Sequence, residues 1–417
     1  MATKQFTGRA ASVAQVTKVI FSSIVATNTY SVTINGKTVS AVATGTSLAA
    51  LLDLLIGAWN VSAEPEHRAF VAAYHYDPSA VLDGLKLTAT KAGVPWTVTA
   101  AATTGSATPT DEVSASGPNF WNVAANWSGA TLPSAGDTLE LIDCTVSILY
   151  GLTDTTNYAA LKVYASYTGQ LGLPAWNVDG YAEYRTRYLT LGDGTVPIAV
   201  TIGEGVGNHA PSLRLNMNDA STTLNVLDGQ SNSSSYPIEV FDMKSTSTGV
   251  VYGGGLLIDD STTGTLASLK VMARAGARTK PRVKVTSRVT VTATECYGQG
   301  TEVELNGAGT TAVVRDSAKL IARSAAAIAT VTSSGRGVIS WQSSGGIATK
   351  LKVETDGDVD FSEQVGAKTV AACEVSRGGK LRDPYKVVTW TAGVALMGGA
   401  RLADVTLDLG PGVTVSV

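Results

Sequence analysis

The sequence predicts a mainly β protein: a small N-terminal α+β module followed by a long β-rich domain, which we expect to be a β-solenoid (a parallel β-helix). Three observations lead to this prediction. An Asn-Gly pair separates two alternating segments within residues 30–40, and a leucine-rich segment follows it. From about residue 120, short bursts of β-type residues alternate with Gly, Asn, Asp and Ser turns. This alternation continues to residue 417. A region of this length is long for one β-sandwich, whereas a β-solenoid can be extended by further coils.

The predicted module comprises residues 1–103 and begins with a β-hairpin whose turn is Asn35-Gly36. Ser47 then offers a helix cap, and four leucines recur at i, i+3, i+4 and i+7. We expect this apolar stripe to pack on a sheet; a partner-binding face is the alternative. The leucines are Leu48, Leu51, Leu52 and Leu55. Three further strands are predicted at 68–76, 85–91 and 96–102.

Residues 104–119 are predicted to be a linker, because they are rich in Ser, Thr, Pro and Gly and show no periodicity. The solenoid is predicted over 120–417. A coil of three short strands takes roughly 20–25 residues, so about a dozen coils would form a rod on the order of 60 Å long. Apolar residues recur at this spacing late in the chain: Leu320, Val338 or Ile339, Val359, Leu381 and Leu402.

The composition excludes several classes of protein. Charged residues make up 16% of the chain, against roughly 25% in an ordinary globular domain, so Thr, Ser, Asn and Gly must cover much of the surface. A hydrophobic content of 44% is too high for a disordered chain. The net charge is −3 and no basic cluster stands out, which argues against a nucleic-acid partner. The densest basic stretch, 273–285, is interpreted as a solvated strand edge, with phosphate binding as the alternative.

The three cysteines, Cys144, Cys296 and Cys373, lie far apart and in no metal-binding pattern. We expect them to be buried core residues of a protein made in a reducing cytoplasm. The first residues lack the order of a signal peptide, and no apolar run approaches 18 residues. No membrane partner is therefore expected.

The residues suited to chemistry are few. Asp356, Asp358 and Asp360 alternate along one predicted strand and are weak calcium candidates; a solvated acidic face that protects a strand edge is favoured. The histidines, His67, His75 and His209, show no ligand or triad spacing. The segment 203–207, GEGVG, lacks the helix and the Lys-Ser/Thr pair of a phosphate loop. We expect no catalytic residue, no cofactor and no bound metal.

One stretch, "TYSVTINGKTV…TSLAALLDLL…LKLTATKAGVPWTVTA", resembles a small module of tailed-bacteriophage virion proteins. In that module a Tyr-x-Val/Ile-x-Ile-Asn-Gly hairpin precedes a helix and an Ala-Gly-x-Pro-Phe/Trp-Thr-Val strand. The resemblance covers about 75 residues. The matching positions are Tyr30, Ile34, Asn35, Gly36, Leu87, Thr88, Ala89, Ala92, Gly93, Pro95, Trp96, Thr97 and Val98.

A second stretch, "NFWNVAANWSGATLPSAGDTLEL", resembles the opening coil of bacterial and phage β-helix proteins. The matching positions are Trp121, Asn126, Trp127, Pro133, Gly136 and Asp137. The open end of a solenoid exposes unpaired strands and core, and bulky indoles are suitable plugs. We therefore expect Trp121 and Trp127 to be structural and buried. An exposed aromatic platform for sugars is the alternative.

Together the two resemblances imply a phage virion structural protein, most simply a capsid decoration, cement or head-fibre protein. A host-binding tail fibre or baseplate protein is one alternative. A polysaccharide-degrading tailspike, which would use paired Asp/Glu residues, is another. The implied partners are a homotrimer of the chain itself and capsid or other virion proteins, with a host surface glycan for the alternatives. The implied location is the virion, after synthesis in the host cytoplasm.

Overall fold

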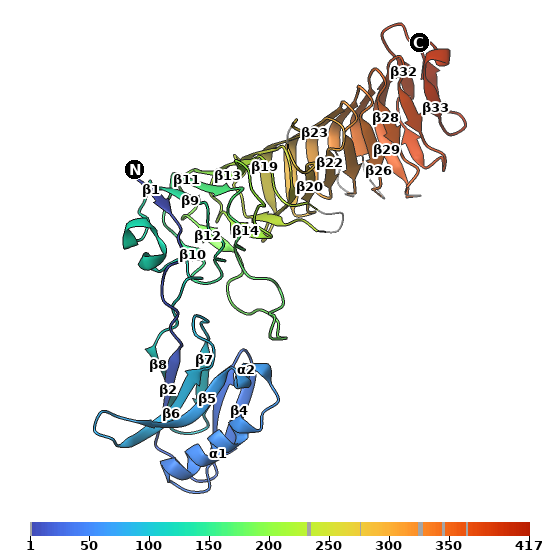
Figure 1. Cartoon of the computed structure of the whole chain (residues 1–417). Helices are drawn as coiled ribbons and strands as arrows, with labels where there is room; N and C mark the ends of the chain where they lie inside the picture. The colour runs from blue at the N-terminus through green and yellow to red at the C-terminus, as the bar shows by residue number, and fades with distance from the viewer. Residues whose placement is uncertain (1, 232–234, 276, 324–327, 344–346, 364–365) are drawn as a thin grey trace.

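The computed structural model describes residues 2–231, 235–275, 277–323, 328–343, 347–363 and 366–417. It consists of a small N-terminal module and a long rod of stacked β-coils (Figure 1). The predicted fold class, a mainly β chain with a β-solenoid after an α+β module, is therefore confirmed. None of the helices in the described ranges is long and apolar enough to cross a membrane.

The rod contains two parallel sheets, and successive strands of the chain alternate between them. Over the described residues one sheet has 15 strands and the other has 12, so the rod has about 12 coils. Each coil contributes one strand to each sheet along most of the rod, rather than the three strands expected. The remaining side of the coil is made by turns and loops, which is why its length varies from coil to coil.

The 15-stranded sheet is formed by β1 (Thr3–Gln5), β9 (Thr138–Leu141), β11 (Ala160–Tyr164), β13 (Ile198–Glu204), β15 (Thr222–Val226), β17 (Thr248–Val251), β19 (Gly264–Met272), β21 (Val289–Tyr297), β23 (Gly309–Arg315), β25 (Ile328–Ser333), β27 (Ile347–Val353), β29 (Lys368–Val375), β31 (Val388–Trp390), β32 (Val394–Leu396) and β34 (Val415–Ser416). The 12-stranded sheet is formed by β10 (Thr153–Asp154), β12 (Leu189–Leu191), β14 (Leu213–Asn216), β16 (Ile238–Phe241), β18 (Gly255–Asp259), β20 (Arg282–Val285), β22 (Glu302–Leu305), β24 (Lys319–Ala322), β26 (Val338–Trp341), β28 (Asp358–Asp360), β30 (Lys380–Arg382) and β33 (Thr406–Asp408). Short 3-10 turns cover Ala124–Asn126, Ser128–Ala130 and Leu402–Asp404.

The core of the rod is a stack of apolar side chains, one above another in neighbouring coils. The predicted late ladder is confirmed for its first four members, because Leu320, Ile339, Val359 and Leu381 pair in register. The prediction for the fifth member, Leu402, was wrong. Leu407 pairs with Leu381, whereas Leu402 is 61% exposed in the 3-10 turn Leu402–Asp404. The coil from Leu381 to Leu407 is longer than the three coils before it, so a constant spacing stops five residues short. The three cysteines are buried, as expected.

The module packs two antiparallel sheets and a helix around a separate core. The four-stranded sheet has the order β5 (Phe70–Tyr76), β6 (Leu82–Ala89), β2 (Val16–Ser22) and β8 (Ser106–Val113). The three-stranded sheet has the order β4 (Lys37–Val42), β3 (Thr29–Ile34) and β7 (Val98–Ala102). The helices are α1 (Leu48–Asn60) and the one-turn α2 (Pro65–Arg68).

The helix α1 forms where the leucine stripe predicts it. Ser47 is its N-cap, and the Ser47 hydroxyl accepts a hydrogen bond from the Ala50 amide at 3.4 Å. The side chains of Leu51, Leu52 and Leu55 are at most 1% exposed and face the module's own core. The stripe therefore packs on the module itself, and the alternative of a partner-binding face is wrong for these three residues.

Two predicted boundaries need correction. The segment predicted as a linker, 104–119, contains the strand β8, which pairs with β2 along its length. Its polar composition is that of an edge strand with most side chains exposed, and Pro109 is tolerated there for the same reason. At the other end, β1 lies outside the module and pairs with β9 of the rod. The chain thus starts in the rod, forms the module and returns to the rod.

Candidate functional site

The first coil of the rod is closed by the two tryptophans predicted as plugs. The Trp121 and Trp127 side chains are 1% and 2% exposed, and their rings meet edge-to-face at 4.7 Å. The Trp121 indole donates a hydrogen bond to Asp154 at 2.6 Å, and the Trp127 indole donates to the Trp121 carbonyl at 2.8 Å. Phe6 adds a third ring, 5.5 Å from Trp127. The expectation that both tryptophans are buried is confirmed, and neither can serve as an exposed sugar platform.

The contribution of Phe6 and β1 to this end of the rod was not foreseen. Because β1 pairs with β9, it covers the hydrogen-bonding groups that the first coil would otherwise expose. The pairing joins residues about 135 positions apart, as in the hydrogen bond from the Ala2 amide to Asp137. Because β1 is a polar strand of only three residues, its sequence has no alternation that could reveal the strand or its distant partner.

The predicted hairpin turn forms at Asn35 and Gly36. Both residues have positive φ angles, 49° and 73°, as a two-residue turn between twisted strands requires. The Asn35 amide also donates a hydrogen bond to Glu66 at 2.9 Å. Glu66 is 1% exposed and belongs to α2, so the turn is fixed to the rest of the module. These two residues are structural.

The three acidic residues proposed as weak calcium candidates do not form a common site. Asp358 and Asp360 share the outer face of β28, and both carboxylates contact Arg382 of the next coil, at 2.9 and 3.3 Å. Asp356 lies in the turn before β28, with a φ angle of 57°. Over the described residues, no group of three or more His, Cys, Asp or Glu is arranged to hold a metal ion.

The contacts with Arg382 belong to a charge ladder on the outer face of the 12-stranded sheet. Basic and acidic side chains of neighbouring coils form pairs there, including Arg214–Glu239 at 3.1 Å, Arg282–Glu302 at 2.9 Å and Lys284–Glu304 at 3.2 Å. Each such pair contributes little to stability, since most are partly exposed. Their effect is to neutralise this face. The basic stretch 273–285 supplies two of the pairs, which accords with a solvated strand edge.

The most unusual group of side chains lies where the module meets the rod. A loop, 174–186, leaves the second coil between Leu173 and Arg187, whose backbone groups form a hydrogen bond at 2.9 Å. The loop reaches down to the module (Figure 1). Tyr181 of this loop is 5% exposed in the module's core, with its ring 5.7 Å from that of Trp96. We call this loop the strap.

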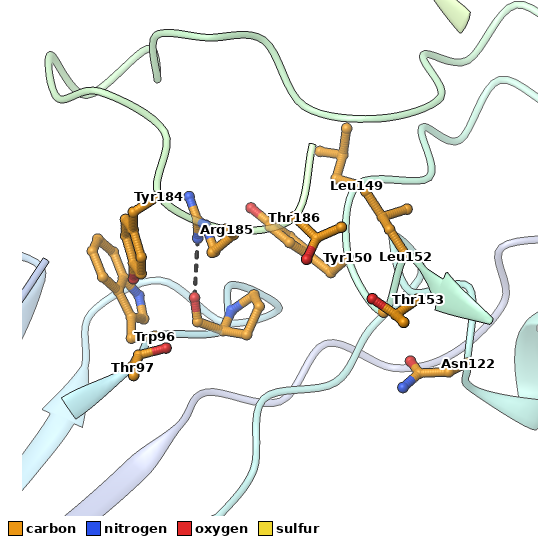
Figure 2. A pocket seen from close by; sticks show the side chains of 12 residues that line it. Trp96, Thr97, Asn122, Leu149, Tyr150, Leu152, Thr153, Tyr184, Arg185 and Thr186 are labelled. Carbon is orange, nitrogen blue, oxygen red and sulfur yellow. Dashed lines mark hydrogen bonds between the residues drawn. The ribbon is translucent and has the colours of Figure 1, made fainter. Parts of the chain in front are cut away.

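Arg185 is the centre of the strap contact. Its guanidinium lies 5.1–5.5 Å from the ring centres of Trp96, Tyr150 and Tyr184. It donates to the Pro95 carbonyl at 3.0 Å, a bond that Figure 2 shows. Two further bonds, at 2.7 and 2.9 Å, go to Glu183, whose side chain is fully buried. The rod provides Tyr150 and the module provides Pro95 and Trp96, so Arg185 joins both parts.

The electrostatics of the strap favour one fixed charge state. Burial by itself would raise the pKa of Glu183, but the bonds from Arg185 and Asn177 outweigh it and lower that pKa. The pKa of Arg185 is raised despite burial, because Glu183 and the tyrosines favour the cation. Burial raises the pKa of Tyr184 to about 12. The Arg185–Glu183 pair is therefore ionised over the whole physiological range, and its charges cancel.

Beside this contact lies a cleft of about 460 Å³. In Figure 2 the rings of Trp96 and Tyr184 lie together at one end, and Thr153 and Asn122 lie at the other. The module and the strap supply the first end and the rod supplies the second. The cleft is therefore built jointly by the module, the strap and the rod.

The tip of the strap presents apolar side chains to solvent. Trp176 is 68% exposed and Val178 is 90% exposed. The tip is nevertheless ordered by local hydrogen bonds, because the Asn177 amide donates to the Tyr181 carbonyl at 2.8 Å. Trp is enriched among the residues that dominate protein interfaces, so this side chain is available as a contact point for another molecule.

None of the strap residues was singled out from the sequence. A signal did exist, since "YAEYRTRY" (181–188) contains three tyrosines and two arginines in eight residues. The pattern has no helical or strand period, however, and its partner Trp96 lies about 90 positions earlier. Only the fold brings the two segments together.

A histidine in the module provides a pH-dependent contact. His75 is 7% exposed and bridges two carboxylates, Asp83 and Glu112, the latter at 2.8 Å. Lys18 also approaches Glu112, at 3.7 Å. Burial lowers the pKa of His75, but the bonds to both carboxylates outweigh that effect and raise it above the ordinary value of 6.5. The bridge ties β8 to the β5–β6 pair.

We expect the module to be more stable at mildly acidic pH. Because the pKa of His75 is raised on folding, its stabilising contribution is complete below about pH 6.5 and is lost as the pH rises through the folded-state pKa. Urea unfolding followed between pH 5.5 and 8.5 measures the trend. The His75→Gln variant, which cannot be protonated, should show a flatter dependence. Equal slopes for the two proteins would contradict the assignment.

Comparison with known proteins gives no match: no family model fits the sequence, and no curated protein and no solved structure matches the chain.

Proposed function

We propose that this chain is a non-enzymatic structural protein of a tailed-bacteriophage particle, most simply a capsid decoration, cement or head-fibre protein. The single observation that supports this most is the strap. A rod whose end module is held by Arg185 and Tyr181 is suited to carrying force or keeping a fixed distance, which a mobile linker is not. The resemblance of the hairpin module and of the first coil to phage proteins supports the same proposal.

The state of the carboxylates supports a structural role over a tailspike. Each carboxyl group in the described ranges whose pKa departs clearly from its ordinary value has a lowered pKa, including Glu304 next to Lys284. A lowered pKa suits a carboxylate that is kept ionised by hydrogen bonds or an ion pair, whereas a general acid for glycoside cleavage needs a raised one. The host-binding tail fibre stays the second candidate, because Trp176 and the cleft offer exposed contact points.

Cross-linking of the full-length chain to purified particles tests the proposal. We expect the chain to sediment with phage capsids, and lysine-reactive cross-links to capsid protein to come from module lysines such as Lys37 and Lys86. Rod lysines such as Lys270 and Lys352 are the internal comparison, since they lie on the outer face of the rod. Links mainly from the rod lysines would show that the rod is the attached part. Sedimentation with tails instead of capsids would favour the tail-fibre candidate.

We further propose that the chain assembles as a homotrimer. The outer face of the 15-stranded sheet carries a column of small side chains in register, including Thr223, Thr248, Ser268 and Ala293. Small side chains allow close approach between copies, and closed symmetry satisfies each such face. Light scattering on the purified chain at micromolar concentration should give three times the mass of 42.9 kDa. A stable monomer under these conditions would exclude the trimer.

A further inference from the structure

We propose that the cleft between the module and the rod binds a neutral saccharide unit. This inference goes beyond a structural role and does not depend on attachment to a particle. The cleft holds about 460 Å³, within the range of small-molecule sites. It lies at the junction of two structural units, which is where such sites are common.

The polar lining of the cleft is free to bind a ligand. The side chains of Thr97, Asn122, Thr153 and Thr186 line the cleft and are exposed. None of the four takes part in a hydrogen bond among the residues that the structure describes. Hydroxyl and amide groups both donate and accept, as the hydroxyl groups of a sugar do. The cleft therefore presents several hydroxyl and amide groups that can bond to a ligand carrying both hydrogen-bond donors and acceptors.

The apolar lining is suited to the C–H face of a sugar ring. Leu149 of the rod, Pro95 of the module and Tyr184 of the strap supply this surface, because all three line the cleft and are half-buried. The cleft therefore presents apolar surface beside its exposed hydroxyl and amide groups, a combination suited to a ligand with both an apolar face and hydroxyl groups.

The charge of the cleft selects against anions. Arg185 is the one basic side chain in the lining, and its guanidinium is already paired with the buried carboxylate of Glu183. No net charge is therefore left to attract a phosphate or a carboxylate. A neutral sugar fits this balance, whereas an acidic sugar would have to compete with Glu183 for the same arginine.

Saturation-transfer NMR on the full-length chain without particles tests the inference. The probes are the methyl β-glycosides of glucose, galactose and N-acetylglucosamine, with glucuronate as the anionic comparison and a proline-rich peptide as a competitor. We expect transfer to the ring protons of at least one neutral glycoside, with a dissociation constant on the order of a millimolar. The Asn122→Ala/Thr153→Ala double variant should weaken this binding by about fivefold or more, since two hydrogen-bonding side chains are lost. Both residues are exposed, so folding should be unaffected.

The matched control is Thr310→Ala, which removes an exposed hydroxyl from β23, far along the rod, and should leave binding unchanged. Four outcomes would overturn the inference: no transfer to any of the three glycosides, equal binding by the double variant, tighter binding of glucuronate, or displacement by the peptide. The last would identify the cleft as a peptide groove. Since no particle is present, a failed attachment experiment has no bearing on this result.

Discussion

Replacement of Trp121 by Ala is expected to lower the free energy of unfolding of the rod by roughly 3–5 kcal/mol, the usual cost of removing a large buried aromatic side chain. The Trp121 ring is 1% exposed, packs against Trp127 and donates to Asp154. Its removal leaves a cavity at the end of the stacked core and takes away one of the three hydrogen bonds that the Asp154 carboxylate accepts; those from Tyr158 and Thr156 remain. Denaturant unfolding followed by far-UV circular dichroism, which is dominated by the strands of the rod, measures the loss.

Trp176→Ala is the matched control, because the same substitution is made at a side chain that is 68% exposed. Its effect on stability should stay within about 0.5 kcal/mol. A small change for Trp121→Ala, together with a loss of sugar binding by that variant, would mean that the indole serves a ligand and not the core. Similar losses of unfolding free energy for Trp121→Ala and Trp176→Ala would show that the burial of the indole does not determine the cost of removing it.

Arg185→Ala is expected to release the strap and let the module move relative to the rod. The substitution leaves the Glu183 carboxylate buried without its cation, and breaking a buried pair in this way costs about 3–5 kcal/mol. The contacts to Trp96, Tyr150 and the Pro95 carbonyl are lost at the same time. We expect faster amide hydrogen exchange over 174–186 and a broader distribution of overall dimensions in small-angle X-ray scattering.

Two further substitutions distinguish the loss of the Arg185–Glu183 pair from the general effect of removing a positive charge. Arg187→Ala removes a neighbouring arginine that stacks on Tyr188 at 5.5 Å and bonds weakly to Leu173; exchange over the strap should change much less. Arg185→Lys keeps the charge but not the two-pronged contact with Glu183, so an intermediate effect is expected. Unchanged exchange in Arg185→Ala would show that Tyr181, and not the ion pair, holds the strap.

Local signals in the sequence determined the elements that depend on neighbouring residues. The Asn35-Gly36 turn follows from two residues that tolerate positive φ, and α1 follows from the leucine spacing and the Ser47 cap. The ladder from Leu320 to Leu381 follows from a coil length that barely changes over that stretch. Trp121 and Trp127 were predicted to be buried because a solenoid end needs large apolar side chains.

Tertiary structure decided the features that join distant parts of the chain. β1 becomes a strand only because β9 offers an unpaired edge, and β8 only because β2 does. Arg185 gains its role from Trp96 and Tyr150, which lie about 90 and 35 positions earlier. Such contacts produce no repeating pattern in the sequence, since each is a single contact between two distant segments. The strap, and the cleft that it forms, therefore could not be predicted from residues that are individually ordinary.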